Sequence, residues 1–276
     1  MTHPIALCAY NRPEHFKRVL SALEQIGVPS LYIFLDGTKT GVDSTATMGV
    51  RWLAENVTWT DPYIIRQKTN IGLARSIINA VDTVLDSRET VIVLEDDCVP
   101  GPHFCRFMDE CLTRYADSKN VISIGGYTMR LPEDVLNAYP YDAYFFPRIE
   151  TWGWATWRDK WALYEPDTVL AYAKAQRQGV NLTAGGNDIP AMIEDKIRRN
   201  TDSWSGGWLL AAALNNMLCV YPTRSHIQNI GMDGSGVHCG KTTKWDVELE
   251  MMTPSRFLDR AEVDAAINAA VLGYYR

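Results

Sequence analysis

The chain has 276 residues, of which 46% are hydrophobic and 22% charged, and its formal net charge is −6. This balance is typical of a soluble globular protein, and the acidic net charge argues against a nucleic-acid partner. No apolar run approaches the roughly 20 residues that a membrane-spanning helix needs, and the first residues, through Leu7, include Pro4 and lack the apolar core of a signal peptide. Six cysteines without a Cys-x-x-Cys pair predict reduced thiols.

Strand-like and helix-like segments alternate through the first half of the chain. Short apolar runs predict buried strands, and apolar residues three or four apart predict helices. Pro13 stands where a helix tolerates proline, in its first turn. The predicted strands are 4–9, 31–35, 63–65, 91–95 and 121–124, and the predicted helices are 13–26, 45–56, 70–85 and 102–115. This alternation predicts an α/β fold, with a Rossmann-like, mostly parallel central sheet flanked by helices.

The second half is richer in helices and in tryptophan. The pattern predicts a strand at 143–146, helices at 168–178 and 188–199, a helix from the Thr201–Asp202 region to about Met217, a strand at 219–222 and a helical tail from about Arg260. A glycine-rich loop, 229–238, ends in His238. We therefore expect a helical half to complete the α/β domain.

Three consecutive acids, Glu95-Asp96-Asp97, follow the apolar strand that begins at Val91. If the strand continues to Pro100, alternation places Glu95 and Asp97 on one face and Asp96 on the other. Ligands bind at the carboxyl ends of strands in open α/β sheets. Two nearby carboxylates repel unless a cation separates them, and a hard cation such as Mg²⁺ or Mn²⁺ prefers such oxygen ligands. The alternative is a solvated acidic loop.

Six segments together resemble the GT-A-fold glycosyltransferases of the family 2 kind, with similarity to N-acetylglucosaminyltransferase I. They are Ala9-Tyr10-Asn11-Arg12-Pro13, Phe34-Leu35-Asp36-Gly37, Asn70-Ile71-Gly72-Leu73-Ala74, Glu95-Asp96-Asp97, the Trp-Gly-Trp-Ala-Thr-Trp block at 152–157 and the glycine-rich loop at 229–238. The resemblance implies a GT-A fold in a single domain, 1–276. Its parts would be a nucleotide-sugar-binding half at 1–125, an acceptor-binding and catalytic half at 126–245 and a helical tail at 246–276.

The resemblance and the chemistry of the residues together predict roles for single residues. Donor binding falls to Ala9, Tyr10, Asn11, Arg12, Asp36, Asn70, Gly72, Arg75, Glu95 and Asp96; Mn²⁺ or Mg²⁺ binding to Asp97 and His238; and acceptor binding to Trp152, Trp154 and Trp204. Local explanations stay open for several of them. Asp36 can open an Asp-Gly turn, Arg75 can be a solvated helix charge, and His238 can be a surface residue. The tryptophans can form a helical core stripe, because Trp154 and Trp157 are three apart.

Sugar transfer to a hydroxyl needs a base for the hydroxyl proton. Asp202 is the candidate for this catalytic role, and its alternative is a plain N-cap of the helix that follows. Family members often place two acidic residues together at this point, whereas this chain has Asp202-Ser203. Glu194 and Asp195, just upstream, are therefore alternative bases.

The predicted function is a metal-dependent, inverting glycosyltransferase that moves a sugar from a nucleotide-diphosphate donor, expected to be a UDP-sugar, to a glycan, lipid-linked or other hydroxyl acceptor. One alternative is a nucleotidyltransferase acting on sugar phosphates, although such enzymes carry a glycine-rich loop after the first strand and this chain has Tyr10-Asn11-Arg12-Pro13 there. The other is a non-catalytic sugar-binding protein. The expected location is the cytoplasm, which allows peripheral contact with the inner face of the membrane.

Overall fold

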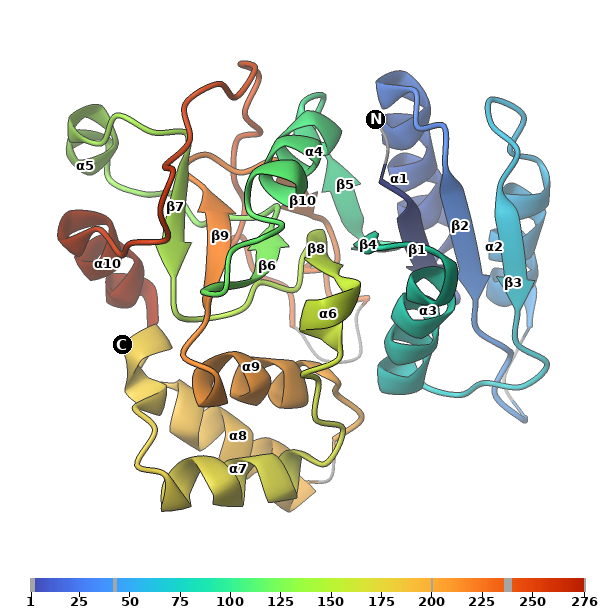
Figure 1. Ribbon diagram of the computed structural model, residues 1–276. Coiled ribbons are helices and arrows are strands. Elements are labelled where there is room, and N and C mark those ends of the chain that lie inside the picture. Colours follow the sequence, from blue (N-terminus) through green and yellow to red (C-terminus); the bar gives the residue numbers. More distant parts are fainter. Residues whose placement is uncertain (1–2, 42–43, 200, 236–239, 276) are drawn as a thin grey trace.

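The structure is a computed structural model that describes residues 3–41, 44–199, 201–235 and 240–275. Its centre is an eight-stranded sheet in the order β3-β2-β1-β4-β8-β6-β9-β7 (Figure 1). These strands are β1 (Ile5–Ala9), β2 (Leu31–Leu35), β3 (Tyr63–Arg66), β4 (Thr90–Glu95), β6 (Val121–Gly125), β7 (Ala143–Phe146), β8 (Trp154–Trp157) and β9 (Leu218–Pro222). The sheet takes strands from both halves of the sequence, so one sheet carries residues from each.

The first four strands form the parallel part of the sheet, in the order β3-β2-β1-β4. Helices α1 (Pro13–Ile26), α2 (Thr45–Glu55) and α4 (Phe104–Arg114) pack on one face, and α3 (Leu73–Ser87) packs on the other. Alternate residues of β1 serve the two faces: Leu7 joins the core under α1, and Ala6 joins the core under α3. The predicted α/β fold with flanking helices is confirmed, and parallel strands dominate its first half.

The other half of the sheet is mixed. β8 runs antiparallel to both β4 and β6, β9 is parallel to β6, and β7 is antiparallel to β9. Residues 154–157 of the tryptophan block therefore form a strand, and a helical stripe through Trp154 and Trp157 is wrong. In β8 these two side chains point to opposite faces, because Trp154 packs in the core under α3 and Trp157 in the core under α1.

Helices α7 (Thr168–Arg177), α8 (Ile189–Arg199) and α9 (Ser205–Leu214) form a lobe below the sheet in Figure 1. The short helix α6 (Arg158–Trp161) leads from β8 toward this lobe, and 3₁₀ turns lie at Leu182–Gly185 and Gly273–Tyr275. Helices α5 (Glu133–Ala138) and α10 (Ala265–Leu272) pack beside β7 and β9, where Val135 and Ile267 border a third core. The lobe of α7, α8 and α9 corresponds to the helical half that the sequence predicts.

The strand predicted at 91–95 ends where expected, but it does not continue through the acids. β4 ends at Glu95, Asp96 and Asp97 form a turn, and a separate strand, β5 (Cys98–Pro100), pairs antiparallel with β10 (Ile227–Asn229). The predicted alternation of the three acids on one continuous strand is therefore wrong. The β5–β10 pair brings the loop after β10 beside this turn, where the Ile230 N–H donates to the Asp97 carbonyl.

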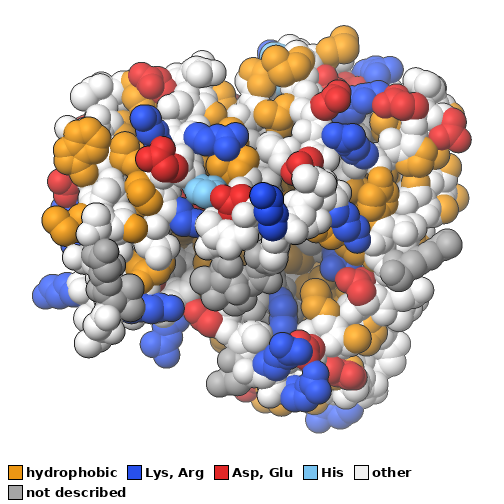
Figure 2. All heavy atoms as spheres, turned by 180° about the vertical axis from the view of Figure 1, so that it is seen from behind, with side chains coloured by type: hydrophobic (Ala, Val, Ile, Leu, Met, Phe, Trp, Pro, Cys, Tyr) orange, Lys and Arg blue, Asp and Glu red, His pale blue; other side chains and the backbone are white. Residues whose placement is uncertain are grey.

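The surface on the side opposite to that of Figure 1 carries interspersed Lys or Arg and Asp or Glu side chains, as Figure 2 shows. Among the described residues, no helix is long and apolar enough to cross a membrane.

Candidate active site

The two aspartates after β4 are paired with a cation from the chain itself. The guanidinium of Arg12 lies between them: Nη1 is 2.8 Å from Asp97 Oδ2, and Nη2 donates to Asp96 Oδ1. The backbone N–H of Tyr10 also donates to Asp96, at 3.3 Å. Because β1 and β4 are neighbours, the loop after β1 lies beside the acidic turn. Arg12 thus supplies the positive charge that close carboxylates need.

Glu95 is the last residue of β4 and pairs in register with Cys8 of β1. Burial and, to a smaller extent, the negative charges of Asp97 and Asp96 together raise the pKa of its carboxyl to about 8. This shift favours the protonated carboxyl, and a protonated carboxyl can donate a hydrogen bond to an oxygen atom.

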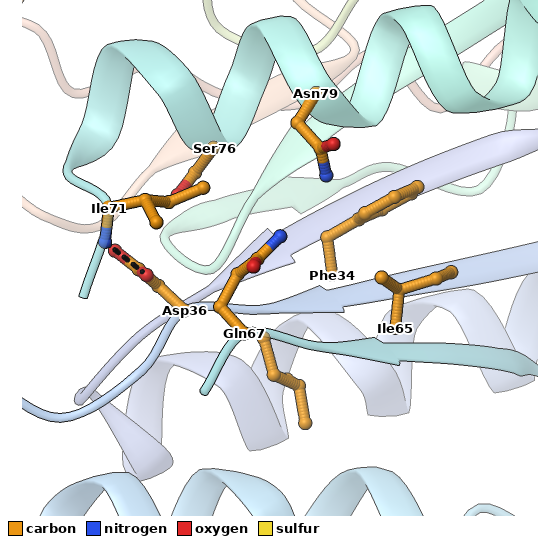
Figure 3. Close-up of a pocket in the computed structure, with 8 residues that line it drawn as sticks. Phe34, Asp36, Ile65, Gln67, Ile71, Ser76 and Asn79 are labelled. Carbon is orange, nitrogen blue, oxygen red and sulfur yellow. Dashed lines mark hydrogen bonds between the residues drawn. The ribbon is translucent and has the colours of Figure 1, made fainter. Parts of the chain in front are cut away.

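Asp36, at the end of β2, holds the segment that leads into α3. Its buried carboxylate, 7% exposed, accepts hydrogen bonds from the N–H groups of Gly37 (2.7 Å), Ile71 (2.9 Å) and Gly72 (3.2 Å), and from Asn70 Nδ2 (2.8 Å). Figure 3 shows Asp36 turned toward Ile71 beside a cavity of about 10 Å³, which has room for about one water molecule. The structure thus brings Asp36, Asn70 and Gly72 together, and the Asp-Gly turn is also present.

Asp202 caps a helix that is not its own. The predicted cap of the following helix is wrong, because α9 begins at Ser205 with Trp204 before it. Asp202 instead accepts the N–H groups of Leu73 (2.7 Å) and Ala74 (3.2 Å) in the first turn of α3. The helical half therefore delivers this carboxylate to the edge where Asp36 binds the preceding residues. A helix N-terminus favours a negative charge at such a place.

The alternative bases have partners elsewhere. Glu194 accepts a hydrogen bond from Tyr172 Oη at 2.6 Å, so it ties α8 to α7. Asp195 pairs with Arg198 and, at 2.9 Å, with Arg199 Nε on the same helix. These contacts stay within the helical lobe, whereas Asp202 reaches α3.

Two of the three tryptophans expected to bind the acceptor are core residues. Trp154 is 0% exposed and Trp204 is 4% exposed, and their rings stack on each other with centroids 4.8 Å apart. The acceptor role is corrected for both, because an enclosed ring has no free face for a sugar. Trp152 is only partly buried, and it packs edge-on against Tyr127 and Trp245. It remains the candidate of the three.

The loop after β10 lies against the acidic turn. The N–H of Ile230 donates to the Asp97 carbonyl at 2.9 Å, and a Cβ on Gly231 would lie only 2.1 Å from Asp97 Oδ2 and 3.0 Å from Arg12 Nη1. Glycine is therefore required where the loop backbone crosses the Arg12–Asp97 pair. His15 of α1 pairs with Asp233 at 3.2 Å and anchors the next part of the loop.

The other donor-site and metal-site predictions fall in different surroundings. Ala9 is buried at the end of β1, whereas Asn11 is exposed in the loop that carries Arg12. Arg75 is exposed on the first turn of α3, one residue beyond Ala74. His238 lies outside the described residues.

Two charged residues that the sequence analysis did not select lie near this edge. Glu150 is buried and accepts the N–H groups of Thr151 (2.8 Å) and Trp152 (3.0 Å), and burial raises the pKa of its carboxyl to about 7. Lys196 donates to the hydroxyls of Ser203 (2.8 Å) and Ser205 (2.7 Å), next to Asp202. Burial, aided by Arg148, lowers the pKa of Lys196 to about 8. Neither residue belongs to a local motif, so only its packing identifies it.

No family model matches the sequence, and no curated protein matches it. Among solved structures, the chain is similar to the mannosyltransferase PcManGT from Pyrobaculum calidifontis in complex with GDP-Man and Mn²⁺, at 16% identity and a TM-score of 0.41, over 60% of this chain and 49% of that one. It is also similar to HddC from Yersinia pseudotuberculosis, at 11% identity and a TM-score of 0.37, over 57% and 78% of the two chains. A UDP-glucose pyrophosphorylase complexed with UDP-glucose gives 10% identity and a TM-score of 0.44, over 84% and 94%. This chain thus spans about half of the mannosyltransferase, and the function has to be argued from the residues of the site.

Proposed function

We propose that this protein is a glycosyltransferase of the GT-A, family 2 kind, which moves a sugar from a nucleotide diphosphate, expected to be UDP, to a hydroxyl acceptor. The observation that carries the proposal is the convergence of acidic groups at one edge of the sheet. Asp96 and Asp97 follow β4, Asp36 follows β2, and Asp202 reaches the same edge from the helical lobe. In open α/β sheets this is the edge at which ligands bind.

The paired aspartates suit a divalent cation. The guanidinium of Arg12 bridges them in this structure, so a positive charge already lies where a metal would act, and carboxylate oxygens are the ligands that Mg²⁺ and Mn²⁺ prefer. Asp97 would hold the metal, with Asp96 beside it. When bound, the metal would neutralise negative charge on the departing diphosphate.

The donor and the acceptor would occupy opposite sides of this edge. Asp36 and Asn70 fix the loop before α3, which would face the base or ribose, and Arg12 lies next to the position expected for the diphosphate. The partly buried Trp152 would lie on the acceptor side, with Glu150 fixing the backbone at its N–H. The sequence halves 1–125 and 126–245 would then divide donor and acceptor binding between them.

Asp202 would accept the proton of the acceptor hydroxyl. As that proton leaves, the hydroxyl oxygen forms a bond to the anomeric carbon, and the bond from this carbon to the diphosphate oxygen breaks, its electron pair leaving with the phosphate. Two backbone N–H groups orient the Asp202 carboxylate, and each of its oxygens keeps a lone pair for the proton. Attack from the side opposite the leaving group inverts the anomeric configuration.

The proposal is tested by incubating the protein with a panel of nucleotide sugars and Mn²⁺, with oligosaccharide and lipid-linked acceptors, and by measuring nucleoside diphosphate. We expect acceptor-dependent release of nucleoside diphosphate from at least one donor, and a product of inverted configuration by NMR. A nucleotidyltransferase would instead form nucleoside triphosphate from a nucleotide sugar and pyrophosphate. A sugar-binding protein without catalysis would bind a ligand and release neither product, and either result would overturn the proposal.

A further inference from the structure

Arg12 holds both aspartates of the acidic turn in one two-pronged contact. One nitrogen of its guanidinium meets Asp97 at 2.8 Å, and the other donates to Asp96. The side chains are shielded from water, with exposures of 21% for Arg12, 6% for Asp96 and 14% for Asp97. In such surroundings an ion pair is weakly screened, so removing one partner leaves the other strongly uncompensated.

Ile230 and Gly231, in the loop after β10, lie against this contact. Gly231 approaches both Asp97 Oδ2 and Arg12 Nη1 so closely that it has no room for a side chain, and Ile230 binds the Asp97 backbone. The oxygen Asp97 Oδ2 is thus occupied by Arg12 and flanked by Gly231. A metal that approaches Asp97 through this oxygen meets the positive guanidinium, which repels it.

We propose that Arg12 is the resident counter-cation of the metal site and competes with the divalent metal for Asp97. Arg12 exchanges Asp97 for the diphosphate of the incoming nucleotide, and the metal then takes the released carboxylate. Arg12 stays anchored to Asp96 during the exchange, which keeps it within reach of both partners. This inference rests on the proposed function, because it assumes a nucleotide diphosphate at this edge.

The test measures Mn²⁺ and UDP separately, because competition predicts opposite effects. The variant Arg12→Met keeps the bulk of the side chain and removes its charge, and Arg12→Lys retains a charge. Arg12→Met should bind Mn²⁺ alone about 10-fold more tightly than the wild type, because two cations that compete for one carboxylate are negatively coupled. The same variant should bind UDP in EDTA about 10-fold more weakly. Arg12→Lys should stay near the wild type in both.

Two further variants localise the effect. Adding Asp97→Asn to Arg12→Met should abolish the gain in Mn²⁺ affinity, which places the metal on Asp97. If Arg12→Met does not fold, Arg12→Gln replaces it, since the amide can still donate to Asp96. Purely structural damage would weaken both ligands, so Mn²⁺ affinity that is unchanged or lower in the variant overturns the inference. Free Mn²⁺ is measured by electron paramagnetic resonance, which needs no turnover. The competition between Arg12 and Mn²⁺ can therefore be disproved in a protein that shows transferase activity, and it can be observed in a protein that shows none.

Discussion

Asp202 accepts a 2.7 Å hydrogen bond from the backbone N–H of Leu73, a residue 129 positions earlier in the chain. This contact links the segment before α9 to the first turn of α3. It gives Asp202 two separable roles, because a cap needs only an oxygen acceptor, whereas a general base needs a carboxylate. The first prediction separates these roles.

Replacing Asp202 with Asn should keep the cap and remove the basicity. We expect turnover to fall on the order of 10²-fold or more, as for other positioned acid–base groups, with donor affinity and thermal stability close to those of the wild type. Asp202→Ala should lose turnover and also about 1 kcal/mol of unfolding free energy, because it removes the cap. Steady-state kinetics and urea unfolding measure the two effects.

The control for this pair is Glu194→Gln, which changes the rival base on α8 in the same way and should leave turnover nearly unchanged. Near-normal turnover of Asp202→Asn would falsify the assignment of Asp202 as the base.

Replacing Asp97 with Ala should abolish transfer and the Mn²⁺-dependent part of nucleotide binding. We expect this loss because Asp97 is the proposed metal ligand. It is the more exposed of the two aspartates that pair with Arg12. Isothermal titration of UDP with and without Mn²⁺ measures the loss. Asp86→Ala, at an exposed acid near the end of α3, is the matched control and should behave as the wild type. Equal Mn²⁺-dependent binding by Asp97→Ala and the wild type would show that the metal lies elsewhere.

Replacing Gly72 with Ala should break the contact between Asp202 and α3. Gly72 has φ 86°, and an added Cβ would lie 2.3 Å from Asp202 Oδ2. Gly27 has open space around it and a similar φ of 76°, but its ψ is 54° whereas that of Gly72 is 166°, so Gly27→Ala reports the cost of a left-handed alanine, about 1–2 kcal/mol. We expect Gly72→Ala to lose more unfolding free energy than Gly27→Ala and, unlike it, to lose turnover. Turnover of Gly72→Ala close to that of the wild type would mean that the Asp202 carboxylate tolerates the added methyl group.

Glu150 should make stability depend on pH. The pKa of its carboxyl is raised from 4.5 to about 7, so between these values the folded state holds a proton that the unfolded state has released. Folding stability from this group therefore falls as pH rises through the window. Glu150→Gln cannot titrate, so its stability relative to the wild type should rise between pH 4.5 and pH 8, by on the order of 3 kcal/mol at most.

Urea unfolding at several pH values measures this difference. Glu133→Gln is the control of opposite sign, because Arg224 lowers the pKa of the exposed Glu133. Its wild-type carboxylate contributes stability above the unfolded pKa and loses it as pH falls. A pH-independent difference between Glu150→Gln and the wild type would show that Glu150 keeps an ordinary pKa.

The sequence by itself determined most of the secondary structure, because the signals are local. The helix predicted at 13–26 and the strand at 31–35 match α1 and β2 in full, since apolar spacing and Pro13 act within a few residues. The alternation of strands and helices also predicted the parallel part of the sheet. That part places residues which follow β1, β2 and β4 at one edge, so Arg12, Asp36 and the three acids could be grouped in advance.

Only the tertiary structure decided which groups meet, because these contacts join residues far apart in the chain. Nothing near Asp202 shows that its partner is the first turn of α3, and nothing near Trp154 shows that Trp204 covers its ring. Nothing near the acidic run shows that Cys98–Pro100 forms a separate strand, because its partner β10 lies more than a hundred residues away. The pKa of Glu150 likewise depends on burial, which arises when distant segments pack around it.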